Sequence, residues 1–226
     1  NGYFSEFGTF SVSDWLSRVP QALLAKNLGV PEATFRDFPE EEVYFAKGPT
    51  PPEPAAAPRA GTNPPPLSHK HALLSQNPLE TFPGGREWRV EAKDFPISAT
   101  MTGVVLELAP GALRELHWHP NADEWQYLLS GEIRATLFGS RGRYREATLS
   151  AGDVGYVPQG YGHSLENVGT NPARVLIVFN SGTYETIDLS QWLAGQPADV
   201  LTVNFGRPAA TFDAFPKRDR FIAGGK

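Results

Sequence analysis

The 226-residue chain carries a formal net charge of −5 at pH 7 and has no basic run of the kind that binds nucleic acid or an anionic membrane. It has no cysteine, which excludes disulfides and thiolate metal ligands, and it has no apolar stretch of the roughly 18 residues that a membrane span requires. We therefore expect one or two globular domains, with neither nucleic acid nor a membrane as a partner.

The first 47 residues predict a glycine-marked loop followed by a packet of short helices. Ser13 is the predicted N-cap of the first helix. Pro20 opens a second helix, which Gly29 should end in a left-handed conformation, and Pro31 opens a third. An amphipathic helix buries one stripe of apolar residues. The expected buried stripe consists of Leu23, Leu24 and Leu28.

Residues 48 to 70 predict an extended linker. Eight of the chain's 21 prolines lie between Gly48 and Pro66, a composition typical of semi-rigid spacers. Just beyond them, His69 and His71 flank a lysine. Because no carboxylate or third histidine lies near them in the sequence, we interpret this pair as part of a solvated loop, with metal ligation as the alternative.

From residue 71 onward the chain predicts mainly β-strands. Short apolar or alternating segments are separated by turn residues at the intervals typical of antiparallel barrels and sandwiches. The clearest predicted strands are residues 101–108, 133–138, 154–157 and 175–179. The predicted fold class is therefore all-β, a small jelly-roll barrel with flanking short helices.

Residues 111 to 131 hold the most informative motif. Alternate residues of a strand point to the same face, so His117 and His119 can direct both imidazoles to one point. Glu124 follows a Pro-Asn turn that can bring its carboxylate back toward them, and His163 lies 39 residues further on. Three nitrogens and one carboxylate oxygen suit an octahedral Mn(II) or Fe(II) site with open positions, although Zn, Ni or Cu would also bind. Histidines without a metal are the alternative, which the cost of burying three imidazoles disfavours.

The end of the chain repeats the pattern of its beginning at a constant offset of 177 residues. Thr9 to Gly29 and Thr186 to Gly206 share eight identical positions, including a tryptophan and the closing glycine. We therefore expect residues 71 to 210 to form a barrel with its own C-terminal helical packet, followed by a tail over residues 211 to 226. Residues 1 to 47 would then close a preceding barrel that this chain lacks. A single barrel with helices on both flanks is the alternative.

The ligand stretches resemble the two signature motifs of the cupin superfamily. In the first, a glycine and five residues precede His-x-His, and four residues, a glutamate, six residues and a second glycine follow. The second runs from Gly152 to Asn167 at the superfamily's spacing. The match is closer to one family, because three segments resemble the second barrel of the oxalate decarboxylases, which are two-barrel manganese enzymes. These segments are residues 113–127, 151–158 and 189–193.

The resemblance covers nearly all of residues 1 to 210 apart from the linker, and it implies a cupin fold, Mn(II) as the cofactor, dioxygen as a co-reactant and oxalate as the substrate. The implied metal ligands are His117, His119, Glu124 and His163. Arg114 would pair with bound oxalate, a role that suits a planar guanidinium. Its alternative is a surface ion pair with Glu115 or Asp123. The family's trimers and hexamers imply a homo-oligomer, while localisation stays open between cytoplasm and secretion.

Two departures from the family leave the reaction open. Residues 5 to 9 resemble the lid of the family's first barrel, in which Glu6 matches the acid/base glutamate, but Phe7 and Gly8 differ. A solvated loop glutamate is the alternative for Glu6. Ile177 stands where the family has a glutamate near the second metal, and an isoleucine cannot carry a proton. The sequence therefore predicts a decarboxylase that gives formate and carbon dioxide, with an oxalate oxidase that gives hydrogen peroxide and a non-catalytic metal-binding module for assembly and stability as alternatives.

Overall fold

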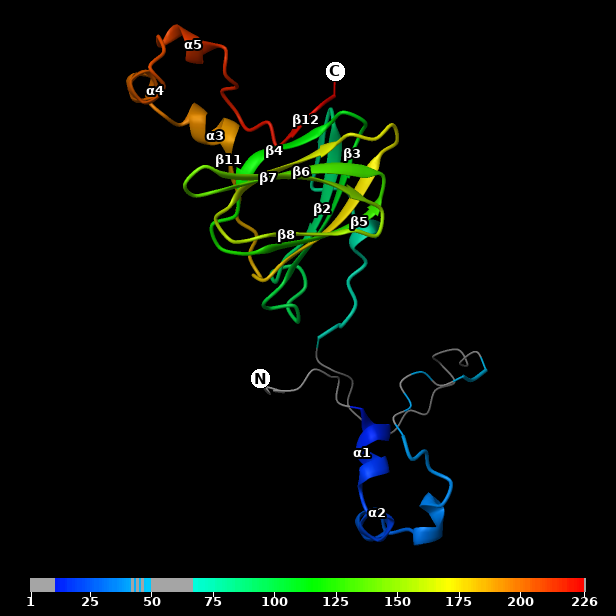
Figure 1. The fold of residues 1–226 in the computed structure, drawn as a ribbon. Coiled ribbons are helices and arrows are strands. Elements are labelled where there is room, and N and C mark those ends of the chain that lie inside the picture. Colours follow the sequence, from blue (N-terminus) through cyan, green and yellow to red (C-terminus); the bar gives the residue numbers. More distant parts are fainter. Residues whose placement is uncertain (1–10, 42, 44, 46, 50–66, 226) are drawn as a thin grey trace. The chain divides into compact units, whose positions relative to one another are not determined.

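The computed structural model describes residues 11–41, 43, 45, 47–49 and 67–225 (Figure 1). The chain divides into two compact units, Asn1–Asn63 and Pro64–Lys226, each of which is described here by itself. Glu6 and the rest of the predicted lid lie outside the described residues, as does most of the predicted linker. Among the described residues, the helices are too short or too polar to cross a bilayer.

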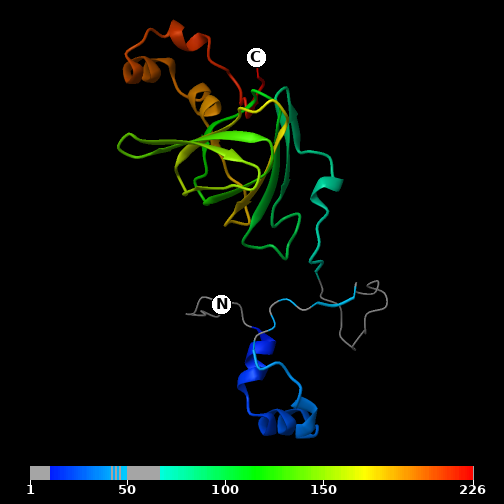
Figure 2. The ribbon, with the colours of Figure 1, turned by 45° about the vertical axis from the view of Figure 1, so that its right-hand side comes forward.

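The first unit contains a packet of short helices at the blue end of the chain (Figures 1 and 2). These are α1 (Val12–Arg18), α2 (Gln21–Leu28) and the 3-10 helix η1 (Glu32–Phe35). The prediction that Ser13 caps α1 is wrong by two residues. Ser11 is the N-cap and accepts a hydrogen bond from the Asp14 amide at 3.5 Å, whereas the Ser13 hydroxyl accepts one from the Val43 amide at 3.1 Å.

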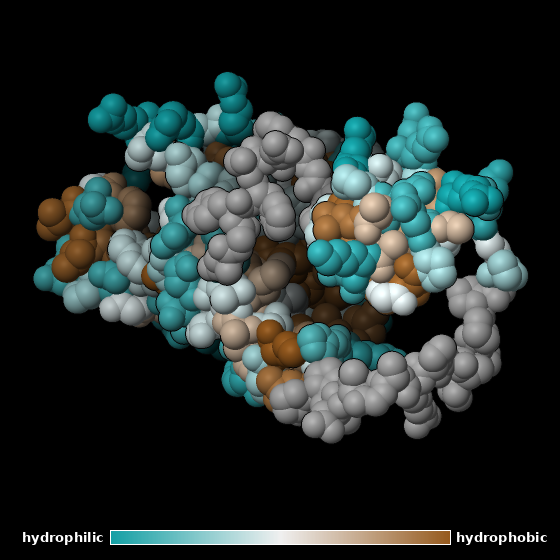
Figure 3. All heavy atoms as spheres, turned by 90° about the horizontal axis from the view of Figure 1, so that it is seen from below, coloured by the Kyte–Doolittle hydropathy of each residue, from teal (hydrophilic) through white to brown (hydrophobic). Residues whose placement is uncertain are grey.

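Helix α2 ends at Gly29 in the predicted left-handed conformation, with φ of 68°. Of the three leucines expected to be buried, only Leu24 is, with 7% of its surface exposed, while Leu23 and Leu28 are 55% and 57% exposed. Adjacent residues of a helix point about 100° apart, so a helix that packs on one short neighbour covers a single narrow stripe. Exposed apolar side chains are therefore part of this unit's surface (Figure 3).

The second unit is built on two antiparallel sheets that face each other (Figures 1 and 2). The first sheet contains, in spatial order, β1 (Glu80–Phe82), β2 (Gly85–Val90), β3 (Thr102–Leu108), β10 (Ala173–Phe179), β5 (Glu124–Ser130) and β8 (Val154–Val157). The second contains β11 (Ile187–Asp188), β4 (Leu113–Trp118), β9 (Gly162–Asn167), β6 (Glu132–Gly139) and β7 (Arg143–Ser150). The predicted strands at 101–108, 133–138, 154–157 and 175–179 are confirmed by β3, β6, β8 and β10.

The segment expected to be a tail contributes to the barrel. Within it, β12 (Ile222–Ala223) pairs with β4, so that Ile222 lies opposite Arg114 and is buried. A 3-10 helix, η3 (Leu73–Ser75), precedes the first strand. A two-residue strand has too few positions for alternation to be visible in the sequence, which is why this pairing was not predicted.

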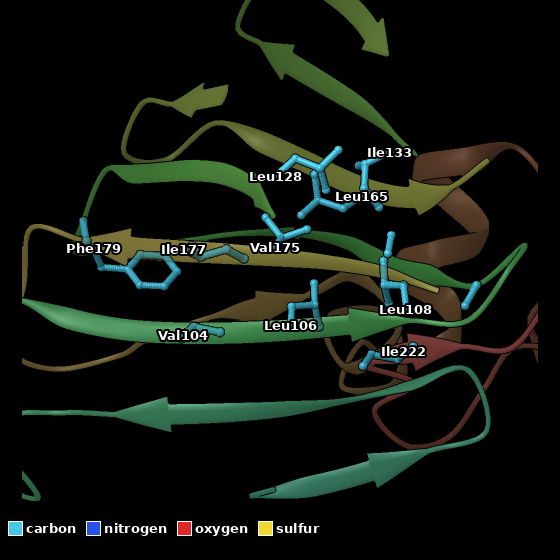
Figure 4. Close-up of a cluster of buried hydrophobic side chains, with 13 residues drawn as sticks. Val104, Leu106, Leu108, Leu128, Ile133, Leu165, Val175, Ile177, Phe179 and Ile222 are labelled. Atoms are coloured by element: carbon cyan, nitrogen blue, oxygen red, sulfur yellow. The ribbon is translucent and has the colours of Figure 1, made fainter. Parts of the chain in front are cut away.

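The hydrophobic core fills the space between the two sheets (Figure 4). Along β10, buried and partly buried residues alternate from Ala173 to Phe179, which places Val175 and Ile177 on the inner face. Leu106 of β3 lies beside Val175 in the same sheet, Leu165 belongs to β9 of the facing sheet, and each is 1% exposed. Burial of each such side chain contributes about 1.5–3 kcal/mol, so the core fixes the register of the strands that carry the site.

A second helical packet follows the barrel and matches the first packet in its elements. Its helices are α3 (Leu189–Ala194), α4 (Ala198–Phe205) and α5 (Ala210–Asp213). Both bounds of α4 lie 177 residues after those of α2, and α4 also ends at a left-handed residue, Gly206. The buried Leu24 and Phe35 of the first packet have buried counterparts at the same offset, Leu201 and Phe212. The sequence repeat is therefore a structural repeat of two helical packets.

Candidate metal centre

The four predicted ligands converge between the sheets. His117 lies in β4 opposite His163 of β9, His119 follows the end of β4, and Glu124 begins β5 in the facing sheet. Their ligand atoms all lie within 4.8 Å of one another, and the four residues are 1–3% exposed. The Pro120 turn thus carries the chain across to the opposite sheet, so that Glu124 closes the site from the other side.

Backbone carbonyls fix the orientation of all three imidazoles. The Nδ1 atoms of His117, His119 and His163 lie 2.7, 2.7 and 3.1 Å from the carbonyl oxygens of Glu115, Glu185 and Tyr161. A carbonyl oxygen only accepts hydrogen bonds, so each Nδ1 carries the proton and donates it. Each Nε2 then presents a lone pair toward the centre of the site. This arrangement of an oriented imidazole with a free Nε2 is typical of metal-binding histidines.

The distances inside the site fit a divalent cation. Nε2 of His119 and Nε2 of His163 lie 2.9 and 3.0 Å from the same oxygen, Oε2 of Glu124. Because both nitrogens and the oxygen present lone pairs, these contacts bring together three electron-rich atoms that need a cation between them. Ligand atoms on adjacent corners of an octahedral ion lie about 3 Å apart. His119 Nε2 is also buried without a hydrogen-bond donor, which agrees with a role as a ligand.

The protonation states suit metal binding. Burial lowers the pKa of His117 well below its usual value, and the positive charge of Arg114 lowers it further. The imidazole is therefore neutral, the form that binds metals. Burial by itself would raise the pKa of Glu124, but the adjacent His163 and His119 outweigh this effect and hold the pKa well below its usual range. Glu124 is therefore an ionised ligand.

Gln126 supports the carboxylate ligand, and the sequence analysis missed it. Its Nε2 donates a hydrogen bond of 2.6 Å to Oε1 of Glu124, and its side chain is buried. Glu124 is thus engaged through both oxygens. The signal was present in the sequence, because Gln126 lies two residues after Glu124 on a strand and so points to the same face.

Arg114 lies beside the ligands but is already paired. The β-bulge between Arg114 and His117 lets residues three positions apart both face inward. The buried Arg114 Nη1 donates to Asp188 Oδ1, Nη2 donates to Thr186 Oγ1 at 3.2 Å, and the guanidinium lies 3.7 Å from the centroid of the Phe221 ring. The surface ion pair with Glu115 or Asp123 is therefore wrong, because the bulge turns Arg114 away from the surface toward a buried aspartate.

A small cavity adjoins the ligands. Its walls include Arg114, Tyr184, Ile177 and a carboxyl that the sequence analysis missed, Glu87 of β2. The centre of a water molecule can reach about 10 Å³ of it, which is room for about one water. Ile177 packs into the hydrophobic core and presents an apolar wall there.

The other histidine pair does not join the centre. His69 is exposed, and His71 lies 3.4 Å from the side-chain oxygen of Gln76. Within the described ranges, the clusters that could hold a metal do not include either residue. Besides the four-ligand centre there is a carboxylate cluster of Glu115, Asp188 and Asp219. Glu115 in that cluster already accepts hydrogen bonds from Ser190 and Phe221.

Comparison with known proteins shows that this barrel is similar to cupins, and to oxalate decarboxylases among them. The family model described as Cupin matches residues 71–209. The chain is 39% identical over 200 residues to oxalate decarboxylase OxdC of Bacillus subtilis. The aligned region covers 87% of this chain and 51% of that protein. It is 33% identical over 220 residues to an oxalate decarboxylase of Arthroderma benhamiae, covering 95% and 51%. A germin-like protein of Arabidopsis thaliana is 34% identical over half of this chain.

Solved structures agree with these sequence matches. The structure of Bacillus subtilis oxalate decarboxylase at pH 4.6 superposes with a TM-score of 0.89 at 34% identity, covering all of this chain and 59% of that one. Another structure of the same enzyme, from a study of its Mn(II) centres, gives a TM-score of 0.88. The chain spans about half the length of the curated oxalate decarboxylases that it matches.

Proposed function

This chain belongs to the cupin family, and we propose that it takes part in the Mn(II)-dependent decarboxylation of oxalate to formate and carbon dioxide. The observation that carries the proposal is the convergence of three lone-pair imidazoles and one ionised carboxylate on a single buried point. The relatives named oxalate decarboxylase support the choice of substrate and reaction.

The chain's own residues supply defined parts of this chemistry. His117, His119, Glu124 and His163 would hold the ion, which supplies a Lewis acid and one-electron chemistry when bound. Arg114 can donate two parallel hydrogen bonds to a carboxylate, once one of its nitrogens is released from Asp188. Ile177 and Phe179 give the cavity apolar walls.

The reaction also needs a group that holds a proton. When hydrogen oxalate is cleaved, the carbon–carbon bond breaks, carbon dioxide leaves and one carbon–hydrogen bond forms, so the acid proton must be taken up and returned. In our proposal Glu6 serves this purpose for a preceding barrel, and it aligns by the 177-residue offset with Thr183, which has no carboxylate. The proposed two-barrel organisation rests on the repeated helical packets, and we expect it to assemble as a trimer or hexamer.

One observation favours a second candidate function, a metal-binding barrel that stabilises the assembly without catalysis. The cavity beside the ligands has room for about one water, and Ile177 fills the place of a proton-carrying side chain. A dicarboxylate is larger than a water, so its binding requires Arg114 and the cavity walls to move.

An assay with oxalate tests these alternatives. Protein purified with Mn(II), with its metal content measured, is incubated with oxalate in air, and formate and hydrogen peroxide are quantified. We expect formate as the main product, and we expect His163→Gln to abolish it while the exposed control His69→Gln does not. Peroxide as the main product would identify an oxalate oxidase. If the protein is fully loaded with metal but forms neither product, the non-catalytic metal-binding barrel is the supported function.

A further inference from the structure

Glu87 brings a second carboxyl to the cavity beside the metal ligands. It lies in the middle of β2, opposite Leu106 of β3, and only 4% of its surface is exposed. Together with Arg114, Tyr184 and Ile177 it forms part of the cavity wall. No step of the proposed function uses it.

The strand register relates Glu87 to Ile177. Glu87 on β2 pairs with Leu106 on β3, and Leu106 pairs with Val175 on β10. Ile177 lies two residues beyond Val175 on the same inner face of β10. The cavity therefore has an apolar side chain on β10 but receives a carboxyl from β2, two strands away. A proton-carrying group is present although Ile177 cannot be one.

Charged groups from several elements face Glu87. Arg89 of its own strand has Nη1 3.4 Å from Glu87 Oε1, and the Arg89 guanidinium is held 4.0 Å from the centroid of the Tyr184 ring. The other charges that act on Glu87 are those of Arg114 on β4, Glu124 on β5 and Asp188 on β11. Burial raises the pKa of Glu87 to about 7 although Arg89 and Arg114 oppose the shift. Both protonation states are therefore accessible near neutral pH.

We propose that Glu87 takes up a proton from solvent when a small carboxylate anion binds beside Arg114 and releases that proton when the anion leaves. In each transfer one oxygen–hydrogen bond breaks and one forms, so no oxidant or further reactant is needed. The negative charge of a bound anion favours the protonated form of Glu87, so binding and protonation support each other. For oxalate as the anion, the inference rests on the proposed function.

Binding of formate and of oxalate to the Mn(II)-loaded protein tests this coupling. Isothermal titration calorimetry between pH 6 and pH 8, in two buffers of different ionisation heat, gives both the affinity and the number of protons taken up. We expect the wild-type affinity to weaken up to tenfold per pH unit as Glu87 ionises, with proton uptake on binding. Glu87→Gln keeps the size of the side chain but cannot ionise, so its affinity should be independent of pH and about tenfold higher than wild type at pH 8.

Two controls separate coupling from a structural effect. Glu132→Gln removes an exposed carboxylate at the start of β6 and should leave the wild-type pH dependence unchanged. Glu87→Asp restores an ionisable group and should restore proton uptake. The proposal is overturned if Glu87→Gln takes up protons as wild type does, if it binds more weakly at every pH, or if neither anion binds. Proton-coupled formate binding without oxalate turnover would support the proposed role of Glu87 and reject the proposed decarboxylase. Oxalate turnover, combined with a Glu87→Gln variant whose anion affinity depends on pH as in wild type, would support the decarboxylase and reject the role of Glu87.

Discussion

Glu124 is the residue on which the centre depends most, because it is engaged through both oxygens. Oε1 accepts the amide of Gln126 at 2.6 Å, and Oε2 faces the Nε2 atoms of His119 and His163. A carboxylate held at both ends keeps one orientation, so the site is organised before an ion enters. The amide of Gln126 is therefore part of the metal site although it contacts no metal.

Removal of that amide should weaken metal binding. We expect Gln126→Leu to lower Mn(II) affinity by about 10–100-fold, because Glu124 loses the donor that orients it while all four ligands remain. Competition with a chelator of known affinity measures the loss. The exposed Gln191→Leu on α3 is the matched control and should bind as wild type does. Unchanged affinity in Gln126→Leu would show that the histidines alone orient Glu124.

At the scale of residues, the sequence predicted the four ligands but not their surroundings. Strand periodicity places His117 and His119 on one face, and motif spacing adds Glu124 and His163. Glu87 and Asp188 could not be predicted in the same way, because each reaches the site through the register of strands distant in the sequence. Glu6 lies outside the described residues, so its role stays a prediction, as does that of Arg114.

At the scale of elements, one buried carboxylate connects β4 to the segments that follow the barrel. Glu115 accepts hydrogen bonds from the hydroxyl of Ser190 at 2.8 Å and from its amide at 3.1 Å, which attaches the start of α3. It also accepts the amide of Phe221 at 2.9 Å, directly before β12. The C-terminal strand is therefore held by Glu115 as much as by its two-residue pairing with β4.

The attachment of β12 should depend on pH through Asp219. Burial and a hydrogen bond with Glu115 raise the pKa of Asp219 to about 6, above its usual value. A raised pKa means that the folded state binds the proton more tightly, so this contribution is fully present below about pH 4 and is lost as pH rises through 6. We expect the β12 amides to exchange with solvent faster at pH 7.5 than at pH 5, after correction for intrinsic exchange, as hydrogen-exchange mass spectrometry can measure.

A substitution isolates this effect. Asp219→Asn cannot ionise and can donate a hydrogen bond to Glu115, so β12 should stay equally protected at both pH values. Asp213→Asn on α5 removes an exposed carboxylate and should keep the wild-type pH dependence. If the β12 amides of wild type were equally protected from exchange at pH 5 and pH 7.5, the proposed effect of the Asp219–Glu115 hydrogen bond would be contradicted.

Apolar patterns along the longer strands made them predictable, and the short elements were not. Residues 133 to 137 of β6 alternate between apolar and other side chains, and residues 175 to 179 of β10 form a continuous apolar run, so both strands could be predicted. The inner face of β10 is shown only by its burial in the structure. The cap of α1 was assigned to Ser13 rather than Ser11, because both hydroxyls suit a cap and the contact of Ser13 with Val43 is not local. The contact across 30 residues decides between them.

At the scale of the whole molecule, two helical packets of matching design accompany one barrel. The packets share the bounds of one helix (α2 and α4), a left-handed glycine and two buried apolar residues at a constant offset of 177. The first packet belongs to a unit without a sheet among its described residues, and its apolar side chains include several that are exposed. Gene duplication of a barrel with its packet would produce this pattern, which supports the proposed two-barrel organisation.

The two units should therefore differ in independent stability. A fragment of residues 64–226 contains both sheets and the buried core, so we expect a cooperative thermal transition close to that of the whole chain. In residues 1–63 the described part of the chain buries two apolar side chains, Leu24 and Phe35, and chains of about 60 residues or fewer are marginal without a large core. We expect it to show weak helical circular dichroism and a gradual, non-cooperative melt. A sharp transition in the short fragment alone would mean that the packet needs no barrel, and the inference of a partner barrel for residues 1 to 47 would lose its physical basis.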